Sequence, residues 1–184
     1  MAQTWRVKAE RNRKPRPPLD EEGLERIALF YAGRYATTRA RLDAYLRRKL
    51  KERGWGGPGE PPLDRLIERF AALGYVDDRA FATARAASLG RRGYGERRVV
   101  QALHAAGIAE ADAAPALERT RDEALAAALR FAEKRRLGPF ASQAPDRETR
   151  RKAAAAMLRA GHGYDVVRRI LDAPPGELID PEIP

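Results

Sequence analysis

The sequence predicts an all-α protein made of three tandem three-helix repeats. From Asp20 onward, apolar residues recur at the three- and four-residue spacing of helix faces, and no segment alternates apolar and polar residues as a half-buried strand does. A longer pattern, two apolar residues four positions apart and a glycine four positions later, returns at intervals of 53 and then 54 residues. Its copies are Leu46/Leu50/Gly54, Val99/Leu103/Gly107 and Ala153/Met157/Gly161. Helical repeats of about this length stack to bury faces that one unit leaves open, so we expect an elongated, curved body.

The first repeat is expected to begin with a helix that follows Asp20. Thr38 can cap a second helix, which Gly54 ends, because a hydroxyl satisfies free amides at a helix start and glycine tolerates the backbone of a helix end. A loop rich in Gly and Pro comes next. Pro62 suits the first turn of a third helix, and Gly74 ends it.

The second repeat is expected to start with a helix capped by Asp77 or Asp78 and broken before Gly95. Its middle helix reaches Gly107, and a short third helix follows over Glu110–Arg119.

The third repeat is expected to open at Thr120 and Glu123, which have the Thr-x-x-Glu form of a capping box. Gly138 closes that first helix. Two further helices are expected over residues 146–160 and 164–171.

Both ends of the chain lack a helical period. The first eighteen residues carry six basic side chains against one Glu, which predicts a disordered basic arm, and the last residues form an acidic tail. The predicted organisation is an arm over 1–19, three-helix repeats over 20–75, 76–119 and 120–173, and an acidic tail over 174–184.

Composition argues against most enzyme and metal chemistry. The chain of 184 residues has no Cys, and His104 and His162 lack neighbours at ligand spacing, so we expect no metal, no redox chemistry, no cofactor and no catalytic residue. No Gly-Lys-Ser/Thr phosphate loop is present. No apolar run is long enough for a membrane span and no secretory signal is visible, which predicts a cytoplasmic protein without membrane contact. No long apolar heptad favours a coiled-coil dimer, so a monomer is expected.

The charge balance suggests a polyanionic partner. The formal net charge is +10 and the isoelectric point is near 10.4. However, 30 of the 36 basic residues are Arg, a bias that GC-rich codon usage also produces, so the placement of the charges matters more than their total.

Basic side chains are predicted to face outward from the middle helices. Arg97 and Arg98 of the second repeat occupy the same positions as Arg151 and Lys152 of the third. This equivalence predicts a basic surface along the curved body. An ordinary solvated helix face is the alternative. Tyr94, between two glycines, either stacks on a partner or packs the turn between two helices. The candidate residues for partner or DNA binding are Arg47, Arg48, Lys51, Arg91, Arg92, Tyr94, Arg97, Arg98, Arg151 and Lys152.

Particular segments resemble a known family. Residues 74–82, GYVDDRAFA, and 91–99, RRGYGERRV, resemble the central signature of the bacterial RecX family, and the segments around Thr38 and Arg150 resemble its flanking repeats. The family's first repeat usually has Ser-x-x-Glu where this chain has Thr38 and Arg41, so the helix start loses its reciprocal carboxylate.

This resemblance implies a regulator that is not an enzyme. Such a protein binds the nucleoprotein filament of the RecA recombinase, lies in its helical groove and suppresses filament extension, ATPase, strand exchange and coprotease activity, in recombination, DNA repair and the SOS response. The partners implied are the RecA filament and, weakly, single-stranded and double-stranded DNA. Two alternatives stay open: a helical-repeat protein that binds DNA directly without a recombinase, and a structural adaptor whose basic surface is incidental.

Overall fold

The computed structural model describes residues 16–177 and 179–180, and over these it is helical. It contains nine α-helices and one short 3-10 helix, and the only β pairing among the described residues is an isolated bridge between Leu19 and Trp55. The all-α prediction is confirmed. The predicted disorder of the arm falls mainly on residues 1–15, which lie outside the described residues.

Unit one contains α1 (Glu21–Arg34), α2 (Arg39–Arg53) and α3 (Leu63–Ala72). The predicted cap of α2 is confirmed, because the Thr38 hydroxyl oxygen accepts a hydrogen bond from the backbone N–H of the third residue of the helix. Gly54 ends α2 as predicted, with φ of 79°.

Unit two contains α4 (Asp78–Arg91), α5 (Glu96–His104) and α6 (Glu110–Asp122). Asp77 is the cap of α4, because its carboxylate accepts from the backbone N–H of Ala80 at 2.8 Å. The other candidate cap, Asp78, is itself part of the helix.

Unit three contains α7 (Ala124–Arg135), α8 (Arg147–Arg159) and α9 (Tyr164–Asp172), with a 3-10 turn, η1 (Gly138–Phe140), between α7 and α8. Arg136 ends α7 in the left-handed region, with φ of 53°, earlier than the predicted stop at Gly138.

The predicted capping box at the start of unit three is wrong. Thr120 lies inside α6, and its hydroxyl donates back to the carbonyl of Ala116 at 2.7 Å. Glu123 pairs with Arg119, four residues earlier, at 2.9 Å, so its carboxylate does not cap a helix. The Thr-x-x-Glu spacing therefore falls on the last turn of α6 and the residue after it, where both side chains have local partners.

The repeat is confirmed in the middle helix of each unit. Leu46, Val99 and Ala153 are buried at corresponding places on α2, α5 and α8. The glycine that follows each helix has a positive φ, of 79° in unit one, 71° in unit two and 97° in unit three, a conformation that favours glycine.

Each unit buries its own hydrophobic core. The first core includes Leu19 and Val76, which lie one residue outside the two boundaries predicted for the first repeat. Tyr94 packs against both the second and the third cores. The largest fully buried apolar side chains in the three cores are Leu24, Leu42 and Phe70, then Val99 and Leu103, then Met157 and Ile170.

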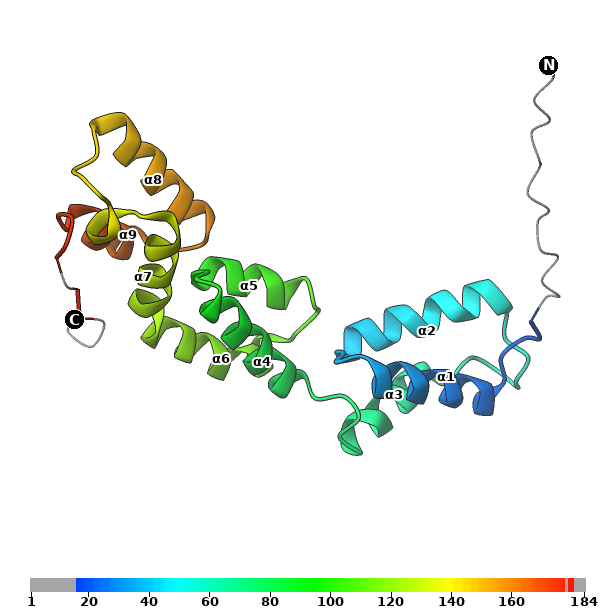
Figure 1. Ribbon diagram of the computed structural model, residues 1–184. Helices are drawn as coiled ribbons and strands as arrows, with labels where there is room; N and C mark the ends of the chain where they lie inside the picture. Colours follow the sequence, from blue (N-terminus) through cyan, green and yellow to red (C-terminus); the bar gives the residue numbers. More distant parts are fainter. Residues whose placement is uncertain (1–15, 178, 181–184) are drawn as a thin grey trace, which may run out of the picture.

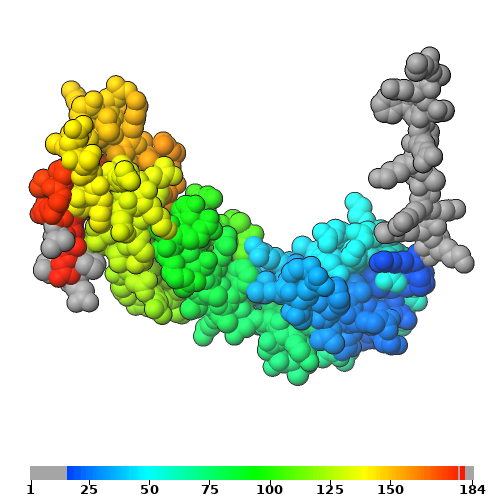
Figure 2. Space-filling view, in the orientation of Figure 1, coloured from blue at the N-terminus to red at the C-terminus, as the bar shows by residue number. Residues whose placement is uncertain are grey.

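The three units form an arch (Figure 1). The middle helices α2, α5 and α8 lie along its concave side, and α1, α3 and α6 lie below them. The space-filling view shows the same bend, with a hollow side above and a convex side below (Figure 2). No helix among the described residues has the length and apolar character needed to cross a membrane.

The first joint connects units one and two at the start of α2. The Thr38 hydroxyl donates to the Ala106 carbonyl at 2.6 Å, and the Arg39 backbone N–H donates to Asp78 Oδ1 at 3.0 Å. Burial raises the pKa of the Asp78 carboxyl, and the bond from Arg39 opposes that shift. The Thr38 hydroxyl therefore caps α2 in unit one and also bonds to unit two.

Replacing Thr38 by Val is expected to lower the free energy of unfolding by about 2–3 kcal/mol, because it removes the α2 cap and the buried bond to Ala106 together. Thr37 is the matched control, since its buried hydroxyl has no hydrogen-bond partner among the described residues. Thr37→Val is expected to leave stability unchanged or raised. Urea unfolding of the two variants checks this, and equal losses would contradict it.

The second joint connects units two and three largely through the backbone. The N–H groups of Gly95 and Arg97 donate to the carbonyls of Ala160 and Gly161, at 3.0 and 3.2 Å. His162 is buried there, with Nε2 at 3.1 Å from the Gly93 carbonyl. A carbonyl only accepts, so Nε2 carries the proton of the neutral ring.

The second joint is expected to weaken in mild acid. Burial lowers the pKa of His162 below its ordinary value of 6.5, and the bond to Gly93 only partly opposes this. The unfolded chain therefore takes up a proton first as pH falls through about 6.5, so stability is lost on acidification, by up to about 1.4 kcal/mol per pH unit from this group. Urea unfolding between pH 8 and pH 5 should show the loss.

His162→Gln should remove this part of the slope, whereas His104→Gln, a control at an exposed position on α5, should keep it. A slope that persists unchanged in His162→Gln would assign the pH dependence to other groups.

Candidate partner-binding surface

The nine predicted basic candidates are all exposed, and Tyr94 is half-buried. Seven of the nine lie on the middle helices of the concave side, and the other two close α4 (Figure 1). These positions are Arg47, Arg48 and Lys51 on α2, Arg97 and Arg98 on α5, Arg151 and Lys152 on α8, Arg91 at the last turn of α4 and Arg92 just after it. Their role as contacts stays a prediction.

Units two and three present their basic pair in the same way. Arg97 and Arg98 directly precede the buried Val99, and Arg151 and Lys152 directly precede the buried Ala153. At the corresponding places α2 carries Ala44 and Tyr45, and its own basic residues lie nearer the helix end. The basic surface is therefore regular across units two and three and shifted along the helix in unit one.

Several of these cations already have a neighbouring carboxylate. Arg47 pairs with Asp43 at 2.7 Å, which raises the pKa of the guanidinium. Arg48 lies 3.7 Å from Glu52, and Lys152 pairs with Glu148 at 2.7 Å. In each pair the two residues are four positions apart on the same helix. Such exposed pairs contribute little to stability and are easily exchanged for a partner's carboxylate or phosphate.

Lys51, Arg97 and Arg151 form no ion pair with a carboxylate of the described residues. Each middle helix therefore carries at least one basic candidate without a described carboxylate partner. A partner that meets these three side chains does not have to displace an internal acid first.

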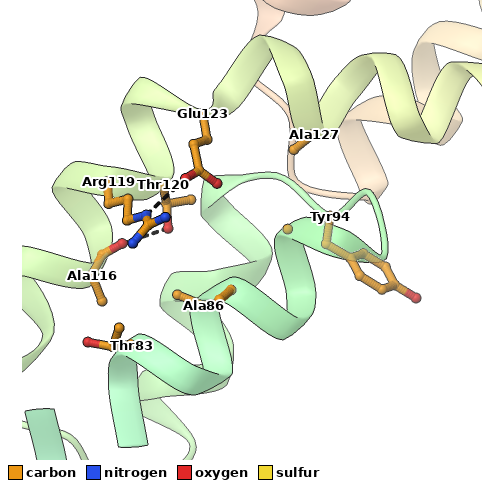
Figure 3. Close-up of a pocket in the computed structure, with 10 residues that line it drawn as sticks. Thr83, Ala86, Tyr94, Ala116, Arg119, Thr120, Glu123 and Ala127 are labelled. Atoms are coloured by element: carbon orange, nitrogen blue, oxygen red, sulfur yellow. Dashed lines mark hydrogen bonds and ion pairs between the residues drawn. The ribbon is translucent and has the colours of Figure 1, made fainter. Parts of the chain in front are cut away.

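Tyr94 is enclosed by cations. The guanidinium carbons of Arg92 and Arg98 lie 5.2 and 6.0 Å from its ring centroid, within the range of a cation–π contact. In Figure 3 the ring points away from Arg119 and Glu123, with the hydroxyl at its far end. Its contacts with two cores agree with the packing interpretation, and the ring also holds Arg98 in place.

The hollow beside Tyr94 is too small for a substrate. It lies between α4, α6 and α7, measures about 30 Å³ and is lined largely by Ala and Thr side chains (Figure 3). That volume suits a water molecule. Sequence reasoning missed a larger hollow at the first joint, because its walls come from segments that no local pattern brings together.

Comparison with known proteins points to one family. A model described as the second three-helix domain of RecX matches residues 77–117. The regulatory protein RecX of Myxococcus xanthus is 32% identical over 176 residues, which cover 91% of this chain and 94% of the relative. That of Agrobacterium fabrum is 30% identical over 140 residues, 75% of each chain. That of Thermus thermophilus is 37% identical over 105 residues, 56% of this chain and 70% of the relative.

Solved structures show the same fold at lower identity. The crystal structure of RecX from Lactobacillus salivarius superposes with a TM-score of 0.67 at 22% identity, covering 82% of this chain and 94% of that one. A second crystal structure, of a regulatory protein RecX, gives a TM-score of 0.60 at 19% identity, over 84% and 78% of the two chains. With a relative at 32% identity along almost its whole length, this chain belongs to the RecX family of regulatory proteins.

Proposed function

We propose that this protein binds the RecA nucleoprotein filament and negatively modulates its extension, ATPase, strand exchange and coprotease activities. It does so in the cytoplasm as a monomer, without catalysis and without a cofactor, and it binds bare single-stranded or double-stranded DNA only weakly. The site candidates proposed for this contact are the basic residues of α2, α5 and α8, with Arg91, Arg92 and Tyr94 beside them.

The observation that supports this proposal most is the line of cations on the concave side of an arch. A curved body with its charge inside the curve fits a long, rounded, anionic object better than a flat one (Figure 2). The filament offers acidic protein surface and nearby phosphates, and both favour exposed guanidinium groups. The unpaired Lys51, Arg97 and Arg151 spread this attraction over all three units.

The direct test is the ATPase rate of the cognate RecA on single-stranded DNA, with this protein added far below the amount that covers the DNA. Binding of the protein to the same bare DNA is measured beside it at low and moderate salt. Inhibition at such low additions, with weak binding to bare DNA at moderate salt, supports a filament regulator.

The second candidate function is direct DNA binding without a recombinase, which the net charge of +10 favours. It predicts a different result in the same experiment. Inhibition would appear only once the DNA is saturated, and it would vanish together with DNA binding as salt rises, since phosphate contacts release counterions.

A further inference from the structure

A second surface with the chemistry of a binding site lies at the first joint. It is a hollow of about 620 Å³ between unit one and unit two. We call it the joint groove and define it by Tyr35, Thr37, Arg41, Tyr75, Phe81 and Arg85, which line it. The link between α3 and α4, which supplies Tyr75, lies on the convex side of the arch (Figure 1).

The floor and rim of the joint groove are apolar. Between its aromatic residues the lining is mostly Ala and Gly, which leaves room for another chain's side chains. Tyr35 and Tyr75 remain about half exposed at the rim, and the neighbouring Leu73 is 62% exposed. Aromatic residues that stay open to water around a concave floor are typical of protein interfaces.

Two guanidinium groups set the charge of the joint groove. Arg41 lies over the face of Phe81, at 5.1 Å from the ring centroid, and neither it nor Arg85 pairs with a carboxylate of the described residues. The acid at the groove, Asp77, is already used to cap α4. Capping leaves the charge of Asp77 in place, so the lining of the groove has two guanidinium groups against one carboxylate.

The groove wall also contains an unsatisfied polar atom. Thr37 is 6% exposed, and its hydroxyl has no hydrogen-bond partner among the described residues. A buried hydroxyl without a partner is destabilising, but this oxygen has almost no accessible surface and offers no hydrogen bond to a ligand in the groove. The neighbouring Thr38 shows the contrast, because its hydroxyl is bonded on both sides.

We propose that the joint groove binds a short acidic and apolar peptide segment of a partner protein. Apolar side chains of the segment enter between Tyr35, Tyr75 and Phe81. Its carboxylates pair with Arg85 and Arg41. A nucleic acid fits less well, because Leu73 and the Ala-rich floor offer nothing to a phosphate.

The test uses the full chain alone, so its outcome is independent of any effect on a recombinase. The probe is a short fluorescein-labelled peptide that alternates Asp with Leu and Phe, followed by fluorescence anisotropy. The same peptide with Lys in place of Asp is the charge control, and single-stranded oligothymidylate is the competitor.

The expected result is saturable binding of the Asp peptide that Arg85→Glu weakens about tenfold and Tyr75→Ser also weakens. Thr37→Val should leave both peptide binding and stability at or above those of the unmodified chain, because its hydroxyl is closed off from the groove. The variant with Arg97→Glu and Arg98→Glu should bind the peptide unchanged, because those residues lie outside the joint groove.

Three results would overturn the proposal. These are absence of saturable binding, equal affinity for the Lys peptide, and an affinity that none of the groove variants alters. Displacement of the peptide by oligothymidylate at lower concentration, with the same dependence on Arg85, would overturn it in favour of a nucleic-acid site.

Discussion

Gly95→Ala is expected to be strongly damaging for the addition of a single methyl group, with a loss of roughly 2–4 kcal/mol in the free energy of unfolding. Gly95 meets the end of α8 at the second joint. A Cβ on Gly95 would lie 2.5 Å from the backbone nitrogen of His162 and would overlap the carbonyl of Gly161. Both are main-chain atoms, which cannot swing aside as a flexible side chain does.

The expected loss follows from steric contact and not from backbone strain. Gly95 has φ of −86°, which any residue adopts, so an alanine there is conformationally ordinary. The clash must be relieved by separating units two and three, and this breaks the hydrogen bonds that Gly95 and Arg97 donate across the joint. Urea unfolding and amide hydrogen exchange at Arg97 report the opening.

Gly33→Ala is the matched control for this substitution. Gly33 lies in α1, and a Cβ built on it meets nothing within 4 Å. Alanine there is expected to stabilise the chain by about 0.5–1 kcal/mol, because it favours the helix and meets no obstacle. If Gly95→Ala matched Gly33→Ala in stability, the close approach of the two backbones at the second joint would be refuted.

Reversal of charge at Arg97 and Arg98 is expected to have the largest functional effect. Both residues lie on α5, a helix of the concave side near the middle of the arch (Figure 1), and Arg97 forms no ion pair with a described carboxylate. The variant with Arg97→Glu and Arg98→Glu should need at least about tenfold more protein for half-inhibition of the RecA ATPase, because attraction turns into repulsion. Both positions are exposed, so the fold should persist, as circular dichroism checks.

The control changes the net charge equally on other helices. Arg26 on α1 and Arg65 on α3 are exposed and lie on helices below α2 in the arch. Arg26→Glu with Arg65→Glu should leave inhibition near that of the unmodified chain. Equal losses in the two double variants would mean that total charge decides the effect. Loss of bare-DNA binding together with inhibition, only in the Arg97 and Arg98 variant, would favour the direct DNA-binding function.

Local backbone requirements explain which parts of the fold were predictable. Thr38 at a helix start and Gly54, Gly107 and Gly161 at helix ends each meet a hydrogen-bonding or conformational requirement of a few adjacent residues. Their spacing in the sequence therefore reveals the repeat. Thr120 has the right spacing for a cap but lies in the last turn of α6, and no local signal separates the two cases. Arg136 ends a helix in the left-handed conformation without being a glycine, so the sequence did not indicate that this helix ends there.

The candidate surface was predictable in part for the same reason. Helical periodicity shows which side chains face outward, and all the predicted cations are exposed. The pairs of Arg47 with Asp43 and of Lys152 with Glu148 also follow from four-residue spacing. The joint groove and the two guanidinium groups around Tyr94 depend on how units sit against each other, which no single segment encodes.

The separate cores of the three units have a consequence for how the chain folds. Each core is built from residues that are close in sequence, so the loops that must close are short and the contact order is low. The first core is completed by Val76, so unit one can form on the ribosome while the later units are still being made. Docking across the two joints then sets the curvature as a late step, after the helices of each unit have packed.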